Sequence, residues 1–192
     1  TLIDLDLHHQ YMYNTLQLNN GFRSNDGIPV FSDIAQLAGM SGTDWSWAPL
    51  LFDMDNDGLK DLFIANGIKR DFINEDYLKY VEKRFKEISA SGRMDKNELI
   101  TSVLNQMPER KKNNYFFRNN GDLTFEKMNG VWTDNIPTCS NGSAYADFDN
   151  DGDLDIIVNN SESPSFIYKN KARENGSGNY LRINFNGPKL NP

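Results

Sequence analysis

The sequence predicts a mainly β protein, built from β-propeller blades of four antiparallel strands, with an α-helical hairpin inserted between two of them. Three observations predict this fold: two Asp-rich loops of equal spacing, short β-type segments that recur around each loop, and a helical stretch between the copies. The chain has 192 residues, enough for one ordinary domain with a core. Its residues are 38% hydrophobic and 12% aromatic, which is a globular composition.

The β-type segments form two imperfect copies of one unit. Matching segments are NTLQLNNG (14–21) and NYFFRNNG (114–121), and then FSDI (31–34) and FEKM (125–128). Asn-Gly between β-type segments is the strongest short signal of a hairpin. Another β-type run follows each Asp-rich loop, at 62–66 and 156–160, and a third partial copy lies at 165–171. Short antiparallel strands that repeat in this way are typical of propeller blades, about two full units and partial ones here.

Between the copies, apolar residues recur at helical spacing. In residues 74–90 one face carries Leu78, Val81, Phe85 and Ile88, and Asn74 suits the N-cap. A second pattern starts at Asp95, keeps Leu99, Val103 and Met107 on one face, and ends at Pro108. This hairpin either covers a blade edge or docks a partner, and the sequence leaves both interpretations open.

Composition narrows the classes of function. The net charge of −7 and the pI near 4.8 argue against a nucleic-acid partner, because phosphate binding requires a basic face. The single cysteine, Cys139, leaves no internal disulfide and fits a structural thiol better than a nucleophile. No apolar run approaches the roughly 20 residues of a membrane-spanning helix.

The two Asp-rich loops, DMDNDGLKD and DFDNDGDLD, carry carboxylates at positions 1, 3, 5 and 9. These are Asp53, Asp55, Asp57 and Asp61 in the first loop, and Asp147, Asp149, Asp151 and Asp155 in the second. Four carboxylates that turn toward one point repel unless a cation lies between them, and hard oxygen ligands in this number suit Ca²⁺. Gly58 and Gly152 at position 6 permit a sharp turn with positive φ. The carbonyl at position 7, from Leu59 or Asp153, would then face the metal, with the Asp153 side chain in solvent.

Three other interpretations of such loops are an EF-hand, a magnesium site and a turn without metal. An EF-hand loop needs a bidentate Glu at position 12 and flanking helices, whereas position 12 is Ile64 or Val158 and both flanks are β-type. Mg²⁺ requires a stricter octahedral shell and usually keeps several waters. Solvated Asp turns without metal are the remaining alternative, made less plausible by two loops at the same place in a repeat.

The loops and their surroundings resemble a known family. DMDNDGLKDLFIAN and DFDNDGDLDIIVNN are similar to the D-x-D-x-D-G-x-x-D loops of FG-GAP/VCBS-type repeats, which also occur in integrin α-subunit propellers. GNYLRINFNG (178–187) resembles the strands that open the ASPIC/UnbV module of bacterial VCBS-repeat proteins. The resemblance implies one Ca²⁺ per loop, with ligands at positions 1, 3, 5, 7 and 9, in a propeller of about seven blades.

These observations together give a predicted organisation and function. The segments are 1–70 with the first calcium loop, 71–112 as the helical insertion, 113–175 with the second calcium loop, and 176–192 as the start of a further β module. We expect a non-catalytic calcium-binding segment of an exported or cell-surface protein that binds a protein or a glycan. By family analogy its partner includes an outer-membrane nutrient-uptake complex. The alternative is a propeller-based extracellular lyase or hydrolase with structural calcium only.

Overall fold

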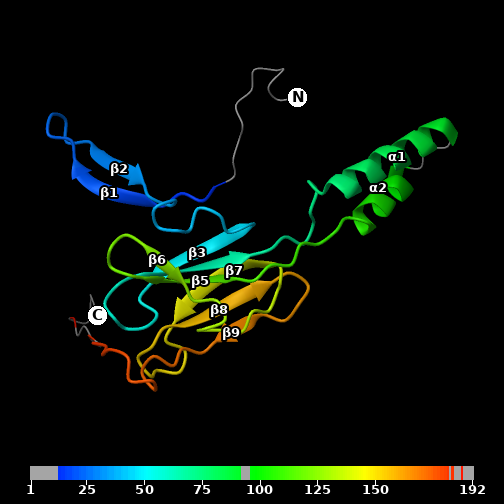
Figure 1. Cartoon of the computed structure of the whole chain (residues 1–192). Helices are drawn as coiled ribbons and strands as arrows, with labels where there is room; N and C mark the ends of the chain where they lie inside the picture. Colours follow the sequence, from blue (N-terminus) through cyan, green and yellow to red (C-terminus); the bar gives the residue numbers. More distant parts are fainter. Residues whose placement is uncertain (1–12, 92–95, 182, 184–186, 188–192) are drawn as a thin grey trace.

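The computed structural model describes residues 13–91, 96–181, 183 and 187, whose strands form three antiparallel sheets (Figure 1). The elements are β1 (Gln17–Phe22), β2 (Pro29–Asp33), β3 (Ser46–Phe52), β4 (Asp61–Asn66), α1 (Glu75–Ser91), α2 (Lys96–Asn105), β5 (Tyr115–Asn119), β6 (Phe125–Lys127), β7 (Ser140–Ala146), β8 (Asp155–Asn160) and β9 (Phe166–Tyr168). The strand orders are β1-β2, β3-β4-β5-β6 and β7-β8-β9. The mainly β class with two helices is confirmed, although the described strands form an open row of sheets rather than a closed ring.

Within the four-stranded sheet, β4 is buried on both faces, and this explains its continuous apolar run. Successive side chains of a strand point to opposite faces, so the two sets of β4 residues enter two different cores. Phe63 and Ala65 pack with Phe52, Phe116 and Val158 toward the three-stranded sheet. A second core forms on the other face, where the loop after β2 packs on the sheet, with Leu62, Ile64, Phe117, Ala35, Ala38 and Met40.

The sheets contact each other mainly through β3 and β7. The rings of Phe52 and Tyr145 stack with centroids 4.4 Å apart. Ser143 Oγ donates a 2.8 Å hydrogen bond to the Ala48 carbonyl, which joins the two sheets along their strands. Because β3 and β7 lead into the two Asp-rich loops, this contact places the loops beside each other.

The sheets correct the predicted position of the helical insertion. The sequence unit runs from a hairpin to an Asp-rich loop, so it placed the helices between two blades. In the structure β4 pairs with β5 across the insertion, with Leu62 opposite Phe117 and Ile64 opposite Tyr115. The helices therefore interrupt one sheet. The two larger sheets each begin with the strands around an Asp-rich loop, and strands of the next sequence unit continue them, β5-β6 in one sheet and β9 in the other.

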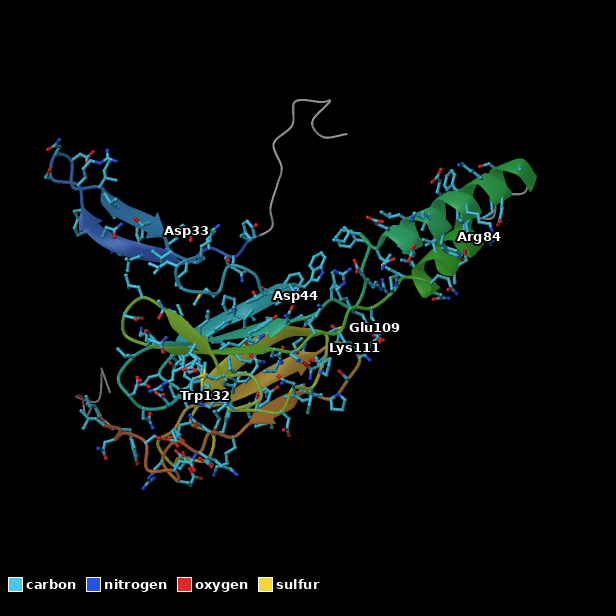
Figure 2. All side chains as sticks on the ribbon, viewed as in Figure 1. Asp33, Asp44, Arg84, Glu109, Lys111 and Trp132 are labelled. Carbon is cyan, nitrogen blue, oxygen red and sulfur yellow. The ribbon has the colours of Figure 1, made fainter. Side chains whose placement is uncertain are left out.

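A short stalk carries the helices away from the sheets (Figure 1). Ile68 and Arg110 exchange two backbone hydrogen bonds of 3.0 and 2.8 Å, and Asp71 N–H donates to the Pro108 carbonyl at 2.8 Å. The buried Asp71 carboxylate also binds Arg110 at 2.7 Å. Glu109 and Lys111 lie at this stalk (Figure 2). The stalk thus extends the β4–β5 ladder and closes the insertion at its base.

The helices form where the periodicity predicts them, but their contacts differ from the prediction. Asn74 caps α1, since its side-chain oxygen accepts the Tyr77 N–H at 3.0 Å. Tyr77 is buried and donates its hydroxyl to the Val103 carbonyl of α2 at 3.2 Å. Leu78 and Phe85, expected on the packed face, are exposed because α1 turns Tyr77 to its partner instead. Neither described helix is long and apolar enough to cross a membrane.

Two sequence predictions fall partly outside the described residues. The second helix was expected to begin at Asp95, which lies outside them, and α2 is described from Lys96. In the predicted strand at 178–187, Gly178–Leu181 are not in a strand, and Leu181 and Ile183 are exposed rather than inward. A strand needs a neighbour to hydrogen-bond with, and these described residues have none. Phe185 lies outside the described residues.

Candidate metal centre

The two Asp-rich loops join equivalent strands, β3 to β4 and β7 to β8. In each, the entering strand ends one residue before position 1, and the Asp at position 9 opens the exit strand. The backbone has positive φ at two matching positions: Gly58 (89°) and Gly152 (100°) at position 6, as predicted, and Asn56 (58°) and Asn150 (62°) at position 4. The two loops therefore have the same conformation.

Within the first loop, backbone amides hold the carboxylates in place. Asp53 accepts the N–H groups of Asp57 at 3.1 Å and of Gly58 at 2.9 Å. Asp57 in turn accepts the Leu59 N–H at 2.8 Å. Asp55 also accepts the Asp57 N–H at 3.3 Å. The loop therefore curls around its own carboxylates.

The second loop repeats these contacts. Asp147 accepts the Gly152 N–H at 3.2 Å, and Asp151 accepts the Asp153 N–H at 3.0 Å. Asp149 accepts the Asp151 N–H at 3.3 Å. Since the same hydrogen bonds recur 94 residues apart in sequence, they belong to the loop motif itself.

The position 9 carboxylates tie each loop to its sheet. Asp61 accepts N–H groups from Met54 and from Asn119 of β5, both at 2.9 Å. Asp155 is bonded in the same way, to Phe148 at 3.1 Å and Asn170 at 2.8 Å. Asp61 is fully buried, and this burial raises its pKa to about 6 even though two N–H donors favour the charged form.

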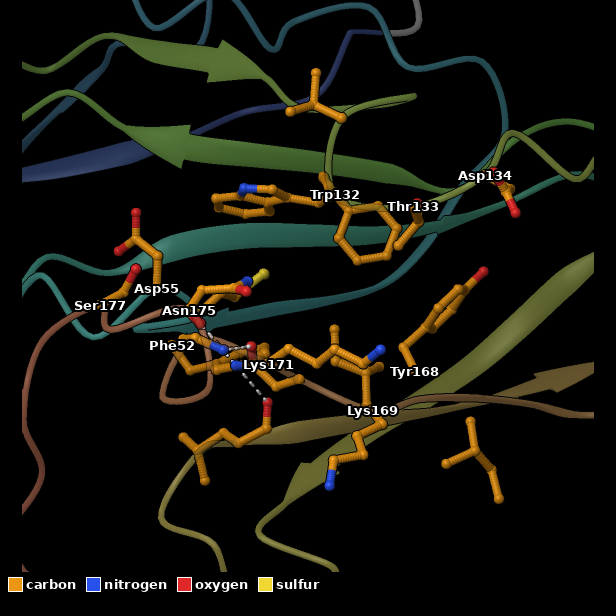
Figure 3. A pocket seen from close by; sticks show the side chains of 18 of the residues that line it. Phe52, Asp55, Trp132, Thr133, Asp134, Tyr168, Lys169, Lys171, Asn175 and Ser177 are labelled. Carbon is orange, nitrogen blue, oxygen red and sulfur yellow. Dashed lines mark hydrogen bonds between the residues drawn. The ribbon is translucent and has the colours of Figure 1, made fainter.

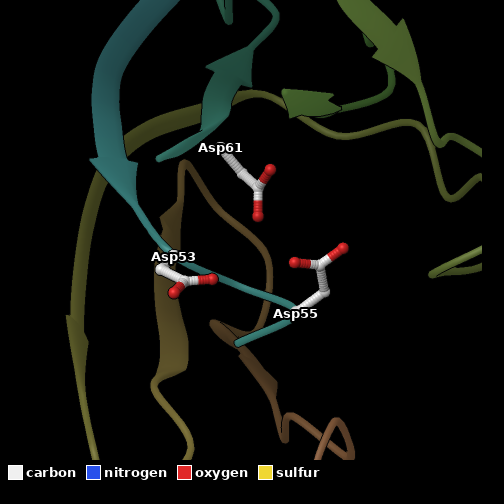
Figure 4. A group of neighbouring side chains, drawn as sticks. All are labelled: Asp53, Asp55 and Asp61. Carbon is white, nitrogen blue, oxygen red and sulfur yellow. The ribbon is translucent and has the colours of Figure 1, made fainter. Parts of the chain in front are cut away.

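The loop carboxylates converge closely enough to share a cation. Asp53, Asp55 and Asp61 each offer an oxygen, all within 4.8 Å of one another, and Figure 4 shows them around one point. Asp147, Asp149 and Asp151 do the same in the second loop. Burial, the nearby Asp57 charge and, to a smaller extent, Asp53 raise the pKa of Asp55, although Arg118 and a backbone N–H lower it, so the pocket disfavours bare negative charge. The donor set, all carboxylate oxygens, fits Ca²⁺.

The predicted ligand sets are thus brought together in part. Asp57 and Asp155 lie in the loops but outside these two groups of three, and the carbonyl roles of Leu59 and Asp153 remain predictions. The structure does test the residue at position 12 of each loop, where an EF-hand would need a Glu ligand. Ile64 and Val158 are buried in strands, which excludes the EF-hand alternative.

The Asp153 side chain contradicts the prediction that it faces solvent. It is fully buried and accepts hydrogen bonds from Asn56 Nδ2 of the first loop at 2.6 Å and from Arg173 N–H at 2.7 Å. Asn170 also joins the loops, because its Nδ2 donates to the carbonyls of Met54 at 2.7 Å and Leu154 at 3.3 Å. The prediction failed because a single loop does not show that a second loop packs against it.

A basic residue lies against each loop, and it comes from β5 for the first loop and directly after β9 for the second. Arg118 Nε is 2.9 Å from Asp55 and its Nη2 is 3.7 Å from Asp57. Lys169 Nζ contacts Asp149 and is 3.5 Å from Asp151. Its hydrogen bond lowers the pKa of Asp149 below the usual range. Sequence reasoning missed both residues, although aligning FFRN (116–119) with IYKN (167–170) places them at one position.

The comparison with protein families supports this repeat. Residues 97–158 match the family model of the FG-GAP-like repeat. The matched part is about a third of the chain and contains the second Asp-rich loop in full. It begins in α2 and then runs through the β5–β6 hairpin into the second Asp-rich loop, in the same order of hairpin and loop as the sequence repeat. A search of curated proteins finds no match to the chain.

Proposed function

We propose that this chain is a calcium-binding segment of an exported β-propeller protein, with one Ca²⁺ in each Asp-rich loop. The observation that carries the proposal is the convergence of three carboxylates in each of two loops with the same backbone hydrogen bonds. Similarity of residues 97–158 to FG-GAP-like repeats supports the same assignment. The expected ligands remain those at positions 1, 3, 5, 7 and 9 of each loop.

Calcium in these loops has a structural role. It would neutralise carboxylates that the fold holds within 4.8 Å of one another, so its binding adds to the free energy of folding. Each loop closes a strand pair, and the position 9 carboxylate links that pair to the next strand. A cation in the loop therefore stabilises the sheet beyond the loop itself.

We further propose a binding role for the wider protein, with a protein or glycan ligand at the cell surface. A cavity of about 640 Å³ lies between β5, β8, β9 and the segment 130–136, within the size range of ligand pockets (Figure 3). Aromatic rings of Trp132 and Tyr168 line it together with the polar side chains of Asp134 and Lys171. Flat rings beside hydrogen-bonding groups suit a sugar. Attachment to an outer-membrane uptake complex rests on family analogy alone.

The alternative is an extracellular lyase or hydrolase in which calcium is structural. Cys139 does not support it as a nucleophile, since the thiol is buried and burial raises its pKa. A glycan array beside a turnover screen on the same polysaccharides separates the two functions. Retention without product supports the binding role, and released oligosaccharide would support the enzyme.

Thermal melts test the calcium part of the proposal. We expect the melting temperature to rise by many degrees in Ca²⁺ relative to chelator, and by less in equal Mg²⁺. Equal melts in Ca²⁺ and chelator would contradict it, and a larger rise in Mg²⁺ would assign the loops to that ion.

A further inference from the structure

Arg118 and Lys169 occupy the same place relative to the two Asp-rich loops. Each precedes an Asn whose backbone N–H binds the position 9 carboxylate, at 2.9 Å for Asn119 and 2.8 Å for Asn170. This hydrogen bond fixes the position of the chain beside the exit strand, at β5 in one sheet and after β9 in the other. It therefore directs the basic side chain before the Asn toward the carboxylates at positions 3 and 5 of the loop. The repeat itself therefore positions these two basic side chains, and their contacts with the loops are not chance ion pairs of the surface.

The carboxylates around Arg118 and Lys169 indicate the role of these two basic side chains. Arg118 contacts Asp55 and Asp57, and Lys169 contacts Asp149 and Asp151. Lys169 also lies 3.5 Å from Glu174, so each basic group faces at least two carboxylates. A fixed positive charge offsets the repulsion of the loop when no metal is bound. The same charge repels a divalent ion and occupies carboxylate oxygens that the ion needs as ligands.

We propose that Arg118 and Lys169 are internal counterions, which hold the metal-free loops closed and lower calcium affinity by competing for the carboxylates at positions 3 and 5. This inference rests on the proposed calcium-binding function. A unit charge about 6 Å from a divalent ion in a water-like dielectric changes affinity on the order of tenfold. The protein would thus fold its loops before calcium arrives and bind it more weakly than the carboxylates alone allow.

The first hairpin offers a natural contrast. In the alignment of 14–21 with 114–121, Leu18 stands where Arg118 stands. Among the described residues β1 pairs with β2 alone, so no exit strand of an Asp-rich loop is its neighbour. Among the described strands, the basic residue accompanies β5 and β9, which pair with the exit strand of an Asp-rich loop, and β1, which has no such pairing, carries Leu18 instead.

Calorimetric calcium titrations of Arg118→Met and Lys169→Met test the competition. We expect each variant to bind calcium about tenfold more tightly at one of its two sites, and to melt at a lower temperature in chelator. Arg118→Lys keeps the charge and is expected to remain within about threefold of the parent. Lys111→Met is the matched control, because it removes one surface charge at the stalk, at the other end of β4 from the first loop.

The possible results separate the inference from the function on which it rests. Unchanged or weaker calcium binding by both Met variants, with a parent that binds, would overturn the counterion role alone. A structural role without competition predicts that weaker binding, so the sign of the change decides. A silent parent would contradict the proposed function as well. If Arg118→Met does not fold in chelator, Lys169→Met in the other loop carries the same test.

Discussion

The contact between the two loops predicts that they lose stability together, and the side chain of Asn56 is the place to test it. Its amide donates a 2.6 Å hydrogen bond to the fully buried Asp153 carboxylate. Asn150 holds the same position in the second loop, with φ of 62° against 58° for Asn56, and is exposed. Glycine tolerates this conformation, so Asn56→Gly and Asn150→Gly have the same backbone effect and differ in the hydrogen bond.

The expected magnitude follows from the charge of the acceptor. A hydrogen bond to a charged group contributes about 1.5–3 kcal/mol, and removing the donor leaves a buried carboxylate with less solvation. For a chain of this size 1 kcal/mol corresponds to roughly 2–4 °C, so Asn56→Gly should melt about 3–12 °C below Asn150→Gly. Circular dichroism melts in chelator measure this without a contribution from calcium. Equal melting temperatures of the two variants would refute the claim that the loops form one unit.

Three further predictions concern the loops, the insertion and the thiol. Asp55→Ala and Asp149→Ala should each remove about 2.7 kcal/mol of calcium stabilisation at a calcium concentration 100-fold above Kd, or roughly 5–11 °C, and equal calcium dependence in parent and variants would count against both loops. Replacing residues 72–107 by a short Gly/Ser linker should leave both calcium sites intact, because the flanking residues Asp71 and Pro108 are already hydrogen-bonded to each other; a lost site would show that the helices belong to the propeller core. Cys139 should react with a thiol reagent at least about 100-fold more slowly in the native than in the unfolded chain, and rapid native labelling would contradict its burial.

Local signals predicted the strands, the helices and the loop motif because each depends on neighbouring residues. The Asn74 cap and the glycines at position 6 act within a few positions of themselves, and the structure places them as expected. The alternation at 178–181 is equally local, but these residues form no strand. The order of the strands in each sheet was missed because a sequence repeat and a sheet need not start at the same point. The pairing of β4 with β5 spans the whole insertion, and no local pattern records it.

The candidate site likewise combines features that local sequence predicts with features that depend on long-range contacts. Convergence of Asp53 with Asp55, and of Asp147 with Asp149, follows from their spacing in one loop. The burial of Asp153 depends on Asn56, which is 97 residues away in sequence, so the loop alone suggested a solvated side chain. Long-range contacts of this kind decide which carboxylates face the candidate metal site and which hold the sheets together.

The most direct test of the account is a calorimetric titration of the chelated chain with calcium. We expect two Ca²⁺ per chain, with heat lost when either loop is altered and with much weaker binding of Mg²⁺. A titration without heat at several temperatures, a single site that survives changes in both loops, or strong preference for Zn²⁺ would contradict the claim that these carboxylates form calcium sites.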